Sequence, residues 1–128
     1  VVDSSVLGSM EFGVGVLGIP LIVVLGHDSC GAVNAAVDAV TSGDMPAGFI
    51  RDIVERVTPS VLAASKHGDA GIDEIEAEHV RQTARLIAER SHLIADHLAA
   101  GRLGIIGATY RLRDGEALVV SSLGLHED

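Results

Sequence analysis

The sequence has little positive charge, very few aromatic side chains and a single cysteine. Its 128 residues include 9 lysine and arginine residues against 18 aspartate and glutamate residues, which gives a formal net charge of −9. A chain this acidic is not expected to follow a phosphate backbone, and an aromatic content of 2% leaves almost no base-stacking surface, so we do not expect nucleic-acid binding. The single cysteine, Cys30, excludes an internal disulfide framework and is typical of a reducing compartment.

The sequence also lacks a convincing membrane segment or signal peptide. Its longest weakly charged run, residues 12–26, is interrupted by glycines and a proline and is shorter than the ~20 apolar residues that span a bilayer. No basic region precedes this run, as a signal peptide would require. We therefore expect a cytoplasmic protein. Hydrophobic residues nevertheless make up 48% of the chain, so some apolar surface is expected to be buried against another subunit.

The remaining pattern alternates between helical and strand periods. Residues 21–25 are five consecutive apolar residues, which predicts a strand covered on both faces, as in a parallel sheet. Further helices are predicted over residues 6–17, 32–40, 50–61 and 73–99, and further strands over residues 103–112 and 117–123. The fold class is therefore α/β, a mainly parallel sheet flanked by helices with an antiparallel C-terminal edge strand, and residues 1–128 form a single domain.

The loop after the apolar strand is chemically the richest part of the sequence. In open parallel sheets, ligands bind beyond the carboxyl ends of the strands. Here His27 ends the strand and Cys30 begins the next helix, where the helix dipole favours a thiolate. An imidazole and a thiolate at this spacing can converge on one cation, and the pair suits zinc better than magnesium or calcium. The alternative is a buried thiol beside a loop histidine, because two ligands do not complete a zinc site.

The other polar residues are interpreted more simply. Asp28 could orient His27 or the loop, but a solvated carboxylate or a helix cap is the preferred interpretation, and Ser29 is a candidate cap for the following helix. No residue beyond the two metal ligands is assigned a catalytic role. The histidines His67, His79, His92, His97 and His126 are expected at the surface. The glutamates Glu74, Glu76 and Glu78 near the start of the long helix suit its dipole.

Residues 20–33, with the sequence PLIVVLGHDSCGAV, resemble the second zinc-ligand motif of the β-class carbonic anhydrases. Residues 4–14 resemble the helix that leads into that motif, with Phe12 where the family often has tyrosine, and the hairpin after residue 105 resembles the family's closing strands. The resemblance implies that His27 and Cys30 are two zinc ligands. It also implies a zinc lyase, which hydrates carbon dioxide reversibly to bicarbonate and a proton by attack of zinc-bound hydroxide, and a homodimer or homotetramer.

One part of the family's pattern is absent from this sequence. The family carries an upstream Cys-x-Asp-x-Arg motif, whose cysteine binds zinc and whose aspartate either binds zinc or pairs with the arginine. Two interpretations stay open: the sequence is the C-terminal part of a β-carbonic anhydrase-like domain, or it is a catalytically incomplete remnant that serves subunit association. The start at Val1 rather than at methionine favours the first, and we expect these residues alone to be inactive.

Three other functions also stay open. The same zinc site could hydrolyse sulfur analogues of carbon dioxide. Cys30 could instead be a nucleophile activated by His27. The strand–loop–helix junction could also bind an anion or a nucleotide, although it lacks the Gly-x-Gly-x-x-Gly spacing.

Overall fold

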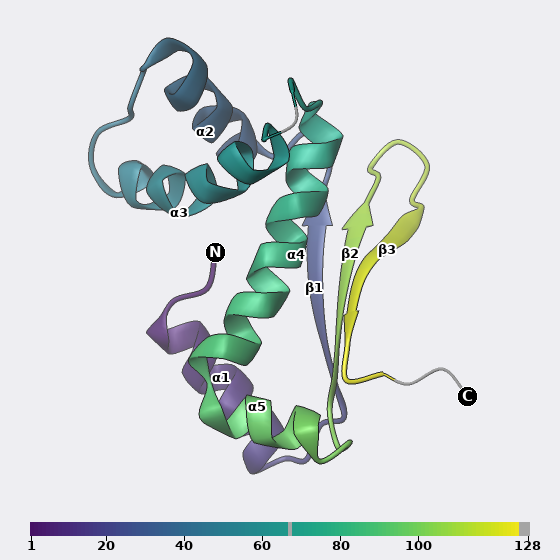
Figure 1. Cartoon of the computed structure of the whole chain (residues 1–128). Coiled ribbons are helices and arrows are strands. Elements are labelled where there is room, and N and C mark those ends of the chain that lie inside the picture. The colour runs from purple at the N-terminus through teal and green to yellow at the C-terminus, as the bar shows by residue number, and fades with distance from the viewer. Residues whose placement is uncertain (67, 126–128) are drawn as a thin grey trace.

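The computed structural model describes residues 1–66 and 68–125 (Figure 1). The elements of this part follow one another as α1 (Ser4–Gly15), β1 (Leu21–His27), α2 (Gly31–Ser42), α3 (Phe49–Ala64), α4 (Ile72–Arg90), α5 (His92–Ala99), β2 (Gly104–Tyr110) and β3 (Ala117–Leu123). The strands form one sheet in the order β1–β2–β3, with β1 parallel to β2 and β3 antiparallel to β2. The predicted α/β class, with an antiparallel C-terminal edge strand, is confirmed.

The helices are placed at both ends of the strands and across one face of the sheet. Helix α4 packs against all three strands. Figure 1 shows α1 and α5 together near the start of β1, while α2 and α3 lie beyond its carboxyl end. One hydrophobic core joins α1, α4 and α5 to the sheet, and a second fills the space between α2, α3 and the start of α4. None of the described helices is long and apolar enough to cross a membrane.

The strand β1 differs from its prediction, because only one of its faces is covered by the residues that the structure describes. Ile22 is buried toward the helices, but Leu21, Val23 and Leu25 are 41%, 54% and 58% exposed. β1 lies at an edge of the sheet and pairs only with β2 in the described part of the chain. Because alternate residues of a strand point to opposite faces, His27 shares the open face with these three apolar side chains. The end of β1 therefore presents its histidine away from α4.

The long helix predicted over residues 73–99 is wrong, because the chain forms two helices, α4 and α5. Ser91 between them is extended, with φ −105° and ψ 110°. Its hydroxyl accepts a hydrogen bond from the Ile94 N–H at 3.1 Å and donates to Glu11 Oε2 at 2.7 Å. The serine thus caps α5 and is held in place from α1. Apolar residues keep their helical spacing on both sides of Ser91, so this spacing alone did not reveal the break between the two helices.

Candidate metal centre

The imidazole of His27 is held in one tautomer by the backbone next to it. His27 is exposed, and its Nδ1 lies 2.9 Å from the carbonyl oxygen of Asp28. A carbonyl oxygen can only accept a hydrogen bond, so Nδ1 carries the proton and donates it. Nε2 then keeps a free lone pair. Histidines that bind metals commonly have this arrangement, in which the second ring nitrogen donates to a carbonyl or carboxylate.

Asp28 ties the loop to the neighbouring strand. Its N–H donates to the carbonyl oxygen of Tyr110 at 3.1 Å, and its Oδ1 accepts from the N–H of Leu112 at 3.0 Å. The preferred interpretation of Asp28 as a solvated carboxylate or a helix cap is therefore wrong, and the alternative, that it orients the loop, is confirmed. The partners lie more than eighty positions apart in the sequence, so no local pattern indicated the contact.

The turn between the two candidate ligands is built by Ser29. Its φ of 55° is the one left-handed value at a non-glycine position within residues 1–66 and 68–125. Such conformations cost of order 1–3 kcal/mol and are found most often where a function requires them. Ser29 does not cap α2, as was expected, because the N-cap position belongs to Cys30. The turn therefore brings Cys30 to the very start of α2.

The predicted placement of Cys30 at a helix start is confirmed. Cys30 is extended, with φ −71° and ψ 118°, and it makes no side-chain capping bond to α2. Its thiol is free and half-buried against the core between α2 and α3. Cys30 therefore holds its sulfur at the N-terminal end of α2.

The donor chemistry of His27 and Cys30 fits zinc, but two donors are too few to hold it. A structural zinc site has four ligands, and a catalytic one usually has three together with water. Among residues 1–66 and 68–125, no group of three or more His, Cys, Asp or Glu side chains is arranged to hold a metal ion. A complete centre therefore needs at least one further ligand from elsewhere.

Glu76, one of the three glutamates near the start of α4, is buried. Glu76 is only 4% exposed, and its Oε1 has no hydrogen-bond partner in the part of the chain that the structure describes. The carboxylate packs against Gly26, where an added Cβ would lie 3.4 Å from Oε1 and 2.6 Å from a methyl group of Val80. Burial raises the pKa of Glu76 to about 7, although the nearby His27 opposes this shift. Glu76 lies one helical turn before Val80, on the face of α4 that packs against the core. This spacing in the sequence is the pattern that could have indicated the burial of Glu76.

Glu76 also lines a cavity beyond the carboxyl ends of β1 and β2. The cavity has a volume of about 290 Å³. Tyr110 lines it together with several charged residues: Asp28, Asp73, Glu76, Arg111 and Glu116. Arg111 is already paired with Asp114 and Glu116. The space next to the loop is therefore predominantly acidic.

The expected surface histidines fall into three groups. His92 is exposed, as expected. His79 and His97 are half-buried, so the expectation of a surface position is wrong for these two. Each ring is held by a hydrogen bond: Nδ1 of His79 lies 2.9 Å from Ser60 Oγ, and Nδ1 of His97 lies 2.8 Å from the carbonyl oxygen of Leu93. The remaining two, His67 and His126, lie outside the described residues.

Comparison with known proteins identifies the family. The family model for carbonic anhydrase matches residues 1–117. The chain belongs to the carbonic anhydrase family. It is 52% identical over 124 residues to carbonic anhydrase 2 of Mycobacterium tuberculosis and 55% identical over 124 residues to a carbonic anhydrase of Mycolicibacterium smegmatis. Each alignment covers 97% of this chain and 60% of the relative, so the chain spans about 60% of the length of these carbonic anhydrases.

Solved structures place the fold in the β class of carbonic anhydrases. The β-carbonic anhydrase of Coccomyxa, in complex with acetazolamide, matches with a TM-score of 0.77 at 22% identity, over 95% of this chain and 56% of that one. A structure from a study of two tetrameric β-carbonic anhydrases of Sordaria macrospora matches with a TM-score of 0.79 at 16% identity, over 94% of this chain and 62% of that one. The resemblance to the β class that the loop motif suggested is therefore confirmed.

Proposed function

We propose that this chain is part of a zinc-dependent enzyme that hydrates carbon dioxide reversibly to bicarbonate and a proton. Membership of the carbonic anhydrase family supports this reaction. The observation that carries the proposal is the hydrogen bond of His27 Nδ1 to the Asp28 carbonyl, which leaves Nε2 free at the mouth of the strand. Cys30, two residues after Asp28, supplies the second donor.

Each residue of the loop has a distinct task in this proposal. His27 binds the metal through Nε2 as a neutral imidazole, and Cys30 binds it as a thiolate from the start of α2. Asp28 holds the ring through its carbonyl and the loop through its carboxylate. When bound, zinc supplies a Lewis acid that brings the pKa of water close to neutral. Val23 and Leu25 precede His27 on the open face of β1, and this apolar surface suits a small uncharged substrate.

The remaining zinc ligands are proposed to come from outside these 128 residues. The chain covers 60% of its mycobacterial relatives, and residues 1–66 and 68–125 supply too few donors for a centre. In this proposal residues 1–128 form the C-terminal part of a single β-carbonic anhydrase domain and are inactive alone. A cytoplasmic location remains part of the proposal because the sequence has one cysteine.

We further propose that the protein acts as a homodimer or homotetramer. Several large apolar side chains in the described residues are more than half exposed: Phe12, Val16, Leu17, Phe49, Ile50, Leu62, Leu118 and Val119. A second copy of the chain could bury such a surface. The tetrameric enzymes of Sordaria macrospora share the fold. A monodisperse monomer of the full-length protein in light scattering would contradict this assembly.

The zinc proposal is tested on the full-length protein with three variants. His27→Ala and Cys30→Ser are expected to lose zinc, measured by metal analysis, and carbon dioxide hydration, measured by stopped flow. His92→Ala removes an exposed histidine far from the loop and should change neither quantity. Wild-type zinc content and turnover in both loop variants would overturn the proposal.

Three further measurements separate the alternatives. Zinc should protect Cys30 from alkylation by iodoacetamide, whereas an activated nucleophile would be labelled rapidly at neutral pH. Hydrolysis of carbonyl sulfide at a higher kcat/KM than hydration of carbon dioxide would replace the proposed substrate by its sulfur analogue. A full-length protein that purifies without zinc, and stays inactive when zinc is added, would support the incomplete remnant.

A further inference from the structure

The ends of β1 and β2 are joined at the metal loop. His27 is the last residue of β1 and lies in register with Tyr110, the last residue of β2. Beyond this pair, the Asp28 N–H donates to the carbonyl oxygen of Tyr110 at 3.1 Å, and the Leu112 N–H donates to Asp28 Oδ1 at 3.0 Å. The Asp28 carboxylate thus accepts a hydrogen bond that a backbone carbonyl would accept in a regular sheet. The turn that follows β2 is therefore attached to the residue that holds the His27 ring.

One peptide group connects this hairpin turn, residues 111–116, to Asp28. A trans peptide group is planar, and its C=O and N–H bonds point in opposite directions. On one side of the group, the Arg111 carbonyl oxygen accepts a hydrogen bond from the Gly115 N–H at 2.8 Å. On the other side, the Leu112 N–H donates to the Asp28 carboxylate. Closure of the turn therefore fixes the direction from which this N–H meets Asp28.

Arg111 also holds the turn through its side chain. Its backbone N–H donates to the carbonyl oxygen of Glu116 at 2.8 Å. Its guanidinium group pairs with Asp114 Oδ2 at 3.2 Å and with Glu116 Oε2 at 3.1 Å. Ion pairs between exposed side chains contribute little individually. We therefore expect Gly115, which closes the turn through the backbone, to matter more than the Arg111 side chain.

Gly115 gives the turn a conformation that few residues adopt. Its φ of 71° lies in the left-handed region. An added Cβ would come no closer than 3.5 Å to the Tyr110 hydroxyl, which is an ordinary contact, so the backbone angle rather than space limits the choice of residue. Asparagine adopts this angle far more readily than most side chains, whereas a β-branched residue such as valine rarely does. This difference allows the turn to be altered without changing the metal loop itself.

We propose that this hairpin turn is a positioning element for the candidate zinc ligand His27. The turn aims the Leu112 N–H at the Asp28 carboxylate, and the Asp28 carbonyl holds the Nδ1 proton of His27. Gly115 and Arg111 are then positioning residues, because both act on the ring through Asp28. The inference rests on the proposed zinc function, which requires Nε2 of this ring to stay free. Every contact that carries it joins residues that the structure describes.

The test compares Gly115→Val with Gly115→Asn in the full-length protein as purified. Exchange of the His27 Nδ1 proton with water is measured by NMR, because the hydrogen bond to the Asp28 carbonyl slows this exchange. Release of zinc to a chelator is measured in parallel. Valine is expected to speed both processes roughly tenfold or more, since loss of a group that orients a ligand weakens metal binding to this extent. Asparagine fits the left-handed conformation and should leave both rates close to those of the wild type.

Gly101→Val is the matched control for backbone strain. Gly101 has the same left-handed conformation, with φ 72°, and an added Cβ would meet no atom within 4 Å. It precedes β2, whereas Gly115 follows this strand, so the two glycines lie at opposite ends of β2. The control should lower the stability to a similar extent and change neither rate. Unchanged Nδ1 exchange in Gly115→Val, or an equal effect of Gly101→Val or Gly115→Asn, would overturn the proposal.

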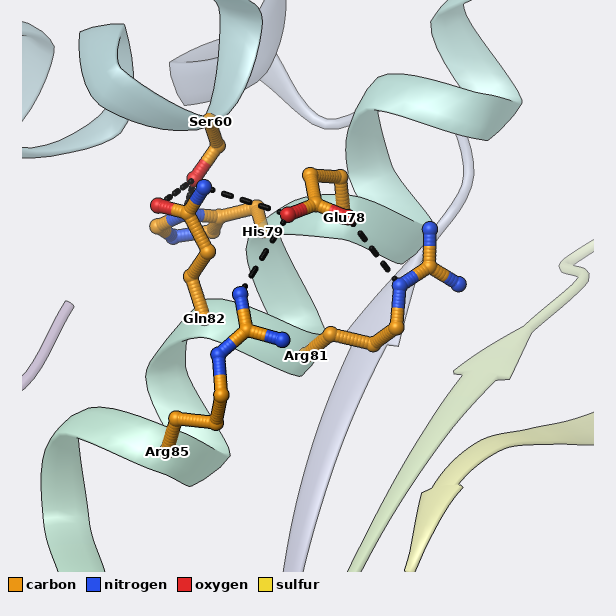
Figure 2. A network of polar contacts seen from close by, with 6 residues as sticks. All are labelled: Ser60, Glu78, His79, Arg81, Gln82 and Arg85. Atoms are coloured by element: carbon orange, nitrogen blue, oxygen red, sulfur yellow. Dashed lines mark hydrogen bonds and ion pairs between the residues drawn. The ribbon is translucent and has the colours of Figure 1, made fainter. Parts of the chain in front are cut away.

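A second pair of variants decides the question if Gly115→Val does not fold. Arg111→Gln removes both ion pairs of the turn and should speed the exchange of the Nδ1 proton roughly two- to fivefold, as expected for exposed ion pairs. Figure 2 shows the matched arginine, Arg81, which donates to Glu78 at 3.1 Å in a network that reaches Ser60 on α3. Arg81→Gln should leave the exchange unchanged. Equal exchange rates in the two arginine variants would overturn the proposal.

The two readouts separate this inference from the proposed function. A wild-type protein that binds no zinc would contradict the proposed function, but faster Nδ1 exchange in Gly115→Val would still support the positioning role of the turn. A zinc-loaded wild type, together with Nδ1 exchange that no turn variant changes, would overturn the positioning role alone.

Discussion

Replacing Glu76 by glutamine should make the stability of the protein depend less on pH. The carboxyl group is 4% exposed, its Oε1 has no hydrogen-bond partner in the described part of the chain, and burial raises its pKa from 4.5 to about 7. Between these two values the folded protein binds more protons at this site than the unfolded chain. The free energy of unfolding therefore falls as the pH rises through this range. The stabilisation by the protonated Glu76 is fully present below the pKa that Glu76 has in the unfolded chain. It is lost above the pKa that Glu76 has in the folded protein.

The size of the effect follows from the same two values. Each unit of pKa corresponds to roughly 1.4 kcal/mol, so a rise from 4.5 to about 7 corresponds to a loss of roughly 3 kcal/mol at alkaline pH. Glutamine has nearly the same shape and no charge at any pH. The Glu76→Gln variant should thus match the wild type near pH ~4.5 and be more stable by roughly 3 kcal/mol above pH ~8.

Urea unfolding of the full-length protein, freed of metal with a chelator so that no cation at His27 adds its charge, measures the difference at several pH values across this range. The matched control is Glu74→Gln, which removes a carboxylate from an exposed position in the first turn of the same helix. The control should change the stability by a similar small amount at every pH. If the difference between Glu76→Gln and the wild type were also independent of pH, Glu76 would titrate as a solvated side chain and the reasoning from its burial would be refuted.

Three further substitutions test the packing and the loop. Gly107→Ala should cost about 1–3 kcal/mol in urea unfolding, because the new Cβ would lie 2.8 Å from a valine methyl group of α4, whereas Gly8→Ala meets open space and should be neutral or stabilising. Ser91→Ala removes the cap of α5 and should lower the free energy of unfolding by about 1–2 kcal/mol. Asp28→Ala should lower the free energy of unfolding by about 1 kcal/mol, and it should reduce the zinc content found by metal analysis. Asp38→Ala, on the exposed side of α2, should change neither quantity.

Much of the local structure could be predicted from the sequence. The strand at residues 21–25, the helix that begins after Cys30 and the last strand, Ala117–Leu123, all formed where their patterns indicated. The turn before that last strand has Gly115 at φ 71°, a conformation that favours glycine. These features depend on neighbours within a few positions, so the side-chain period and the turn chemistry contain the information.

The placement of the candidate site was only partly accessible in this way. The pattern of His27 and Cys30 at a strand–helix junction identified the loop and the family. It did not reveal that Asp28 holds the loop through the N–H of Leu112, or that Ser29 supplies the left-handed turn. The contact of Asp28 depends on how the end of β2 meets the end of β1, which is a relation between distant parts of the chain.

The sequence by itself determined which segments are helices and strands and which two side chains offer metal-binding chemistry. The tertiary structure decided which face of β1 the described residues cover, and it buried Glu76 with no hydrogen-bond partner for its Oε1 among those residues. It also divided one long apolar pattern into two helices at Ser91. The physical reason is the range of the interactions. Propensities and turns act between neighbours in the sequence, whereas burial and hydrogen bonds such as that between Ser91 and Glu11 join residues that only folding brings together.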